Sequence, residues 1–226
     1  MQLLNFYREI IMEKLPVPFR LDFFNLAVDD TAVFCIAMLL AVMVNAEAQA
    51  FTATSLGDSR TDDKGRFHFN AFLHIDIIGL LCFMLAGFGW PREMKITAKQ
   101  FSHPRLFLIL SRFAGPAANF LLANIAASVV WLMSRYGAAD RVFTILAAVN
   151  LTVAVYSILP FPPLAGASLV SVWIPDHAEK FRQIYHRSGP LILLGIFLAE
   201  KISGIKFLSS ILDPVVVFLF QWISGV

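Results

Sequence analysis

The stretch AVFCIAMLLAVMVNAEAQAFTATSL, residues 32–56, decides the fold class. Its first half is continuously apolar, and as a helix the whole stretch can cross a hydrocarbon core about 30 Å thick. Its second half carries Asn45, Glu47 and Gln49. Polar groups inside a span usually face a cavity or another helix. The stretch therefore predicts a membrane helix whose polar side chains face protein.

The composition supports a membrane protein. Of the 226 residues, 58% are hydrophobic and 15% are charged, whereas soluble domains average about half and about a quarter. A soluble protein of this size could not bury so much apolar surface, so membrane lipids are expected neighbours. The net charge is +2 and no Lys/Arg run is present, so nucleic acid is not expected as a partner. Cys35 and Cys82 lie in apolar stretches, where a disulfide is not expected.

Further apolar segments predict an all-α polytopic bundle. Residues 106–133 and 142–173 are each long enough to span, and residues 189–226 form one or two further spans. Residues 72–89 are shorter and are interrupted by three glycines. Residues 1–30 form an amphipathic extension in front of the transmembrane domain, residues 31–226. Its helical spacing predicts a short helix over Leu3–Leu15, lying on the membrane surface or on the protein's own flank.

Basic residues predict the orientation. The loops 57–72, 91–105 and 175–188 carry three, four and three basic residues, so they are expected in the cytoplasm, with the N-terminus outside. Residues 72–89 then have both ends on the same side of the membrane. That segment is expected to be short or re-entrant.

Five short motifs point to one family. They are Leu56-Gly57-Asp58, His74-Ile75-Asp76-Ile77-Ile78-Gly79, Phe88-Gly89-Trp90, Ala114-Gly115-Pro116-Ala117-Ala118-Asn119 and Pro160-Phe161-Pro162-Pro163-Leu164-Ala165-Gly166. In order and spacing they resemble the compact bacterial branch of the site-2 protease family, which are intramembrane zinc metalloproteases. The resemblance runs from about residue 32 to the C-terminus. It implies a site-2-protease-like helix bundle in a bacterial inner (cytoplasmic) membrane.

The residues that hold zinc in that family are replaced in this chain. Where the family has His-Glu-x-x-His, Asn45 and Gln49 stand for the histidines and Ala46 stands for the glutamate. Ala165 stands for the aspartate that is the third ligand. Catalytic zinc needs about three protein ligands and a base for its water, and amides bind zinc poorly. The resemblance therefore implies a degenerate member without metal, cofactor or catalytic residues, a pseudoprotease that is not an enzyme.

Three functions follow as hypotheses. The first is a scaffold or accessory subunit that contacts other transmembrane subunits of a larger complex. The second is a regulatory pseudoprotease that binds transmembrane substrates. The third is a metalloprotease with a metal site rebuilt from other residues, for which the candidates are Glu47, His68, His74 and Asp76. Asn45 and Gln49 are expected to hydrogen-bond to neighbouring helices or loop backbone, and Glu47 is expected to be a buried carboxylate.

Overall fold

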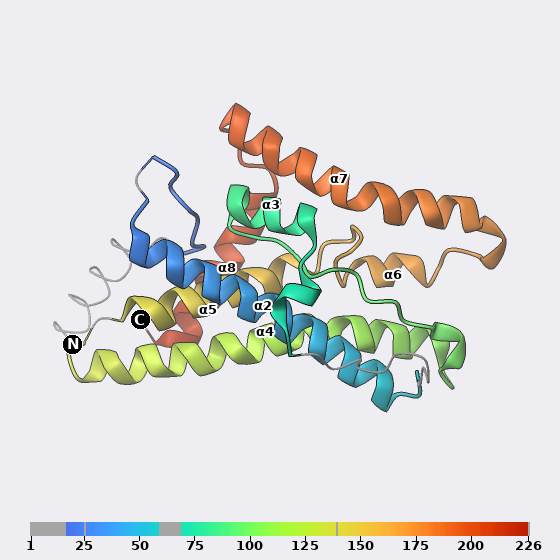
Figure 1. Cartoon of the computed structure of the whole chain (residues 1–226), viewed down its shortest axis with the longest axis horizontal. Helices are drawn as coiled ribbons and strands as arrows, with labels where there is room; N and C mark the ends of the chain where they lie inside the picture. The colour runs from blue at the N-terminus through green and yellow to red at the C-terminus, as the bar shows by residue number, and fades with distance from the viewer. Residues whose placement is uncertain (1–16, 25, 59–68, 139, 226) are drawn as a thin grey trace.

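The computed structural model describes residues 17–24, 26–58, 69–138 and 140–225. In this part of the chain the protein is helical, with one isolated bridge between Ile75 and Pro91. Figure 1 shows the arrangement of the helices. They are α2 (Val28–Ser55), α3 (Ile77–Ala86), α4 (Pro104–Arg135), α5 (Arg141–Tyr156), α6 (Ala167–Ser171), α7 (Glu179–Ser203) and α8 (Leu208–Ser224), with short 3-10 helices at Ala71–His74, Ala98–Gln100 and Asp176–Ala178.

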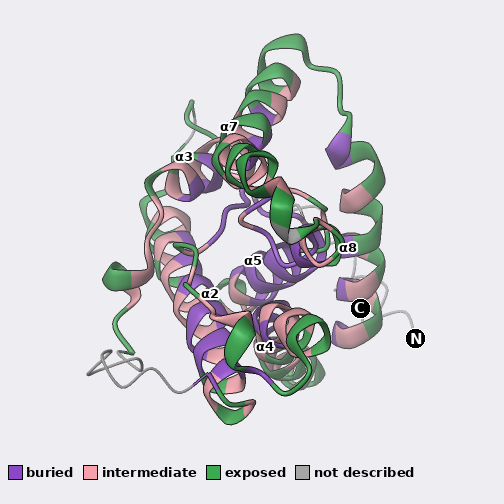
Figure 2. Cartoon of the chain, turned by 90° about the vertical axis from the view of Figure 1, so that its right-hand side faces the viewer, coloured by how far each residue is buried: buried purple, intermediate pink, exposed green. Residues whose placement is uncertain are grey.

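α5 is the centre of the bundle. It packs against α2, α4 and α8, and every residue from Ala147 to Tyr156 is buried. Figure 2 shows this helix in the buried colour between its neighbours. A helix that is apolar on all sides is buried on all sides, and small residues such as Ala147 and Ala148 let the neighbouring backbones approach. The central position of α5 fixes where the turn after it lies.

The expected short segment is confirmed at α3. This helix has 10 residues, which gives a length of about 15 Å, half of a bilayer core about 30 Å thick. Asp76 caps its N-terminus, and the Asp76 side chain accepts a hydrogen bond from the backbone N–H of Gly79 at 2.8 Å. The helix ends at Gly87, which has a positive φ of 71°. α3 packs mainly on α7, and its Phe83 also contacts Phe34 of α2.

A span over residues 142–173 was expected, with the prolines at 160–163 breaking the helix; the break is confirmed, and no one helix covers the segment. α5 ends at Tyr156, residues 157–166 run through turns, and only the five-residue helix α6 follows. The prolines of this stretch cannot donate backbone hydrogen bonds, so the helix stops. The turn is tight because a Cβ on Gly166 would lie 1.9 Å from the carbonyl oxygen of Ile158. This fold-back carries Ala165 toward α2.

Two helices, α2 and α4, are long and apolar enough to cross a membrane by length and composition. Shorter apolar helices are α3, α5 and α8. Together they make an all-α membrane protein. Residues 175–188 were expected to be a loop, but most of them form the first part of α7, which continues through Pro190. The polar side chains of residues 179–188 lie on a helix that has an exposed face, so their polarity did not indicate a loop.

The chain before α2 packs on the bundle. Phe19 and Leu21 are buried in the same core as α2 and α5. Between them, Arg20 donates hydrogen bonds to Ser209 at 3.2 Å and to Asp213 at 2.7 Å, both on α8. The helix expected over Leu3–Leu15 lies outside the described residues.

Candidate functional site

A chain of side-chain amides crosses the centre of the bundle. Gln49 donates to Oδ1 of Asn45 at 2.7 Å, and Asn45 donates to Oδ1 of Asn119 at 2.6 Å. Asn119 in turn donates to Oδ1 of Asn150 at 2.9 Å and to the carbonyl of Ala41 at 2.9 Å. All four amide side chains are buried. They tie α2, α4 and α5 together with interhelical hydrogen bonds, which substitute for the weak hydrophobic driving force in lipid.

Gly115 allows α4 to approach this amide chain. A Cβ on Gly115 would lie 2.4 Å from Oδ1 of Asn45 and 2.9 Å from Nε2 of Gln49. Real Cβ atoms do not approach that closely, so the position accepts only glycine without rearrangement. Gly115 is therefore a point of close contact between α4 and the amides of α2.

Arg112 connects the amide chain to the loop after α3 and to α7. Its guanidinium donates to Oε1 of Gln49 at 3.2 Å, to Oε1 of Glu93 at 3.0 Å and to the carbonyl of Met94 at 3.0 Å. Nδ1 of His186, on α7, lies 3.3 Å from the same carboxylate oxygen of Glu93. Burial opposes ionisation of Glu93, but the His186 hydrogen bond and the Arg112 charge outweigh it and lower its pKa.

Two adjoining cavities lie at this cluster. A small one, of about 10 Å³, is lined by Asn45, Gln49 and Ala165 together with Arg112 and Trp90. That volume corresponds to about one water-sized group. The structure thus brings three of the sequence-selected positions, Asn45, Gln49 and Ala165, around one point. Ala46 is buried beside them on α2 and presents only a methyl group.

A much larger groove, of about 1010 Å³, adjoins the small cavity. The two share Glu93, Arg112, Pro163 and Leu164 in their linings. The wall formed by residues 93–99 is held in place by Asp58, whose buried carboxylate accepts from the backbone N–H of Thr97 at 3.1 Å. The other walls come from the start of α4, from α6 and from the first turns of α7.

Catalytic zinc does not fit the small cavity. Zinc prefers imidazole, thiolate and carboxylate ligands, whereas Asn45 and Gln49 are amides that already bond to each other and to Asn119 and Arg112. The guanidinium of Arg112 adds a fixed positive charge that opposes a second cation. Ala165 supplies no ligand atom.

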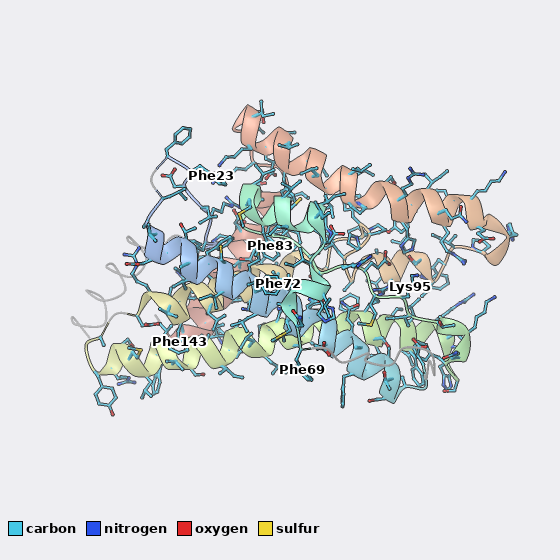
Figure 3. The ribbon with its side chains drawn as sticks, in the orientation of Figure 1. Phe23, Phe69, Phe72, Phe83, Lys95 and Phe143 are labelled. Carbon is cyan, nitrogen blue, oxygen red and sulfur yellow. The ribbon has the colours of Figure 1, made fainter. Side chains whose placement is uncertain are left out.

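Glu47 and His74 form a separate pair on another face of α2. Nε2 of His74 lies 3.0 Å from Oε1 of Glu47, which also accepts from the backbone N–H of Phe69 at 3.1 Å. Both side chains are largely buried. Figure 3 labels Phe69, whose backbone N–H makes this contact with Glu47. Glu47 is thus a buried carboxylate, as expected, and it lines neither of the two cavities.

The other candidate metal ligands do not join this pair. Asp76 caps α3 and accepts from Nε1 of Trp90 at 3.2 Å, and His68 lies outside the described residues. Within the described ranges, no three His, Cys, Asp or Glu side chains come together as a metal site.

Sequence reasoning gave no site role to Arg112, Glu93 or Asn150. A signal was available for two of them. Arg112 and Asn150 lie inside apolar segments, where ionisable and amide residues are costly and commonly mark functional positions. Glu93 carried no such signal, because it lies in a loop where charged residues are ordinary.

The chain is similar to a curated protein of Bacillus subtilis (strain 168), whose name is printed as "Putative zinc metalloprotease YwhC". The two are 27% identical over 201 residues, which cover 79% of this chain and 92% of the relative. No protein-family model matches the chain. No solved structure matches it.

This similarity corrects one expectation. The chain was expected not to be an enzyme, but the relative carries the name of a metalloprotease, which points to protease activity instead. The four replaced zinc positions did not justify that expectation, because they bear on one cavity and leave open a reaction elsewhere in the molecule. The relative's name agrees with the resemblance to zinc metalloproteases that the motifs indicated, and the fold is that of an all-α membrane protein.

Proposed function

We propose that this protein binds a polypeptide segment of another membrane protein in the large groove, as the substrate-binding part of a site-2-protease-like function. One observation carries the proposal: the groove of about 1010 Å³ adjoins the small cavity at the buried amide cluster and shares lining residues with it. A volume at the upper end of ligand sites suits an extended chain better than a small metabolite. The relative's name supports a protein substrate.

The amide cluster gives the inner end of the groove the chemistry to hold a peptide group. Arg112 and Gln49 carry five and two N–H donors, more than their contacts within the cluster use, and each carboxylate oxygen of Glu93 can accept more than one hydrogen bond. A peptide backbone presents both a donor and an acceptor at each residue. Because Arg112 is fixed by three acceptors, these groups are preorganised, which reduces the entropy lost on binding.

Site-specific photocrosslinking tests the proposal. A photoreactive residue at Leu108, in the groove lining, is compared with one at Leu121, which is exposed on the same helix. The probe at Leu108 should capture membrane proteins, and Ser171→Trp, which fills the groove from α6, should prevent that capture. Equal products at Leu108 and Leu121, or products at Leu108 that persist with Ser171→Trp, would refute peptide binding in the groove.

The same experiment separates a substrate from a subunit. A permanent neighbour in a complex gives one abundant product at fixed stoichiometry, as the scaffold hypothesis requires. A set of transient products with several single-span proteins indicates substrates. The proposal places these contacts in a bacterial cytoplasmic membrane, with the bacterial relative as its support.

A second candidate function is peptide hydrolysis at a metal held away from the amide cluster. The pairing of Glu47 and His74 at 3.0 Å favours it, because carboxylate and imidazole are both zinc ligands. Elemental analysis of the purified protein tests this candidate. Stoichiometric zinc that is lost in Glu47→Gln and in His74→Asn, but kept in Asn45→Ala, is the expected result. Equal zinc content in all the variants, or none in the parent protein, contradicts it.

A further inference from the structure

α4 presents one face to the outside of the bundle. It packs against α2, α5 and α8 and runs along an edge of the molecule (Figure 1). Away from these contacts, exposed or partly exposed side chains recur at alternating steps of four and three residues: Ala117, Leu121, Asn124, Ser128 and Trp131. This spacing places side chains on the seam between two parallel helices that pack together. We call these five residues the outer stripe.

Asn124 differs from the other asparagines of the central helices. Helices α2, α4 and α5 carry four asparagines, and in three of them, Asn45, Asn119 and Asn150, Oδ1 accepts a hydrogen bond from another side chain. The Asn124 amide donates to the carbonyl of Phe120, one turn back on its own helix, at 2.7 Å. Among the described residues nothing donates to its Oδ1, so this acceptor and one N–H are unused.

The position of Asn124 in α4 makes an unused amide costly. α4 is long and apolar enough to cross a membrane, and no charged residue lies between Arg112 and Arg135. Asn124 follows Arg112 by 12 residues and precedes Arg135 by 11, which places it about 17 Å along the helix from either charge. It therefore lies inside the hydrocarbon core, where lipid offers no hydrogen bond to a polar group.

A second copy of this chain supplies the missing partner. An amide carries both a donor and an acceptor, so it is complementary to another amide. In a two-fold dimer the same patch of both subunits meets, and two copies with the same orientation in the membrane have parallel α4 helices. Each Asn124 then faces the other at equal depth, whereas a different protein would need its own polar group there.

The charges of α4 permit this self-association. The outer stripe carries no charged side chain that would meet its own equivalent across a two-fold axis. The nearest charge, on Arg135, lies 5.0 Å from the ring centre of its own Trp131. Ala117 and Ser128 are small, which lets two helices approach closely.

We infer that the protein forms a parallel two-fold dimer through the outer stripe of α4, held by reciprocal hydrogen bonds between the two Asn124 amides. The stripe lines neither the small cavity nor the groove, so this inference goes beyond the proposed function and does not depend on it. Hydrogen bonds between membrane helices of this kind change association by roughly tenfold.

Disulfide crosslinking in native membranes locates the interface. With Cys35 replaced by alanine, the remaining Cys82 is fully buried, and Leu121→Cys should give a crosslinked dimer of this chain on mild oxidation. Ile211→Cys on α8 is the matched control, because Leu121 and Ile211 are 63% and 64% exposed. No dimer with Leu121→Cys, equal dimer with Ile211→Cys, or a product that contains a different protein would overturn the inference.

Energy transfer between donor-labelled and acceptor-labelled full chains in lipid vesicles measures how tightly the copies associate. On dilution with lipid, Asn124→Leu should dissociate roughly tenfold more readily than the parent protein, and Asn124→Gln, which keeps an amide, should lose less. Gln221→Leu removes a partly exposed amide from the last turn of α8 and should change nothing. Unchanged association in Asn124→Leu, or no energy transfer in the parent protein, would overturn the inference.

Two readouts separate the dimer from other roles. Asn124→Leu should melt like the parent protein in dilute detergent, because among the described residues Asn124 bonds to no other helix; a large loss would assign Asn124 to the fold of the single chain instead. A photoreactive residue at Leu121 should capture a second copy of this chain, whereas the one at Leu108 captures other proteins. Failure at Leu121 alone overturns the dimer and leaves the proposed function standing.

Discussion

Gly115→Ala is the sharpest test of the amide cluster. The new methyl group would lie 2.4 Å from Oδ1 of Asn45 and 2.9 Å from Nε2 of Gln49. The Asn45 amide would have to move, and its 2.6 Å hydrogen bond to Asn119 would lengthen or break. We therefore expect Gly115→Ala to loosen the contact between α2 and α4.

The size of the effect follows from three contributions. Overpacking costs about 1–3 kcal/mol. Loss of an interhelical hydrogen bond in a membrane costs about 1 kcal/mol. Alanine stabilises a helix by about 1 kcal/mol relative to glycine, which offsets part of the loss. The free energy of unfolding should fall by about 2 kcal/mol.

Thermal melting in mild detergent measures this loss. With Cys35 replaced by alanine, a thiol-reactive dye reports the exposure of Cys82, whose side chain is fully buried in the native fold. Gly195→Ala is the matched control, because no atom lies within 4 Å of a Cβ built at Gly195 on α7. This control should melt at the same temperature as the parent protein or slightly above it.

A second substitution checks the cause. Adding Asn45→Ala to Gly115→Ala removes the side chain that clashes, so the double variant should lose less stability than the sum of the two single variants. The reasoning is refuted if Gly115→Ala melts like Gly195→Ala, or if the two substitutions at positions 45 and 115 are simply additive.

Three further predictions concern charged groups. Asp213→Asn should lower the free energy of unfolding by about 2 kcal/mol, measured by the same melts, because Asp213 accepts from Arg20 at 2.7 Å and from the Tyr156 hydroxyl at 2.6 Å. Arg112→Lys should also lower the free energy of unfolding, by about 1–2 kcal/mol, because a lysine ammonium cannot bond to the three acceptors that the planar guanidinium contacts at once. The folded protein lowers the pKa of Glu93 below its unfolded value of about 4.5, so ionised Glu93 stabilises the fold. This stabilisation is fully present above the unfolded pKa and is lost as the pH falls through the folded pKa. Melting temperature measured between neutral and acidic pH should therefore fall less steeply in Glu93→Gln than in the parent protein, and identical profiles would contradict this.

Long apolar runs made two spans predictable from sequence. Residues 32–56 and 106–133 correspond to α2 and α4, and α4 continues through Pro116 without ending. The short segment at 72–89 was predictable as well, from its glycines and from the basic loops on both sides. Hydrophobicity failed at 142–173, where prolines end α5 although the apolar character continues.

Polar contacts in the site were only partly predictable. Asn45 and Gln49 could be assigned to interhelical hydrogen bonding because amides inside a span need partners. Their partners, Asn119, Asn150 and Arg112, could not be identified, since the register between helices is set by packing that spacing along one helix does not reveal. The activity was judged from four altered positions, and the similarity to a metalloprotease over most of the chain corrected that judgement.

The burial of α5 on every side has a consequence for how the protein is made. α2 and α4 precede α5 in the chain, so they are available in the membrane when α5 enters it. α8, which packs against α5 and has Val216 and Phe220 buried, is synthesised later. Until α8 arrives, one flank of the central helix faces lipid or the insertion machinery. The nascent protein therefore passes through a stage in which one face of α5 is not yet covered by α8. A chaperone or a quality-control protease can recognise that uncovered face.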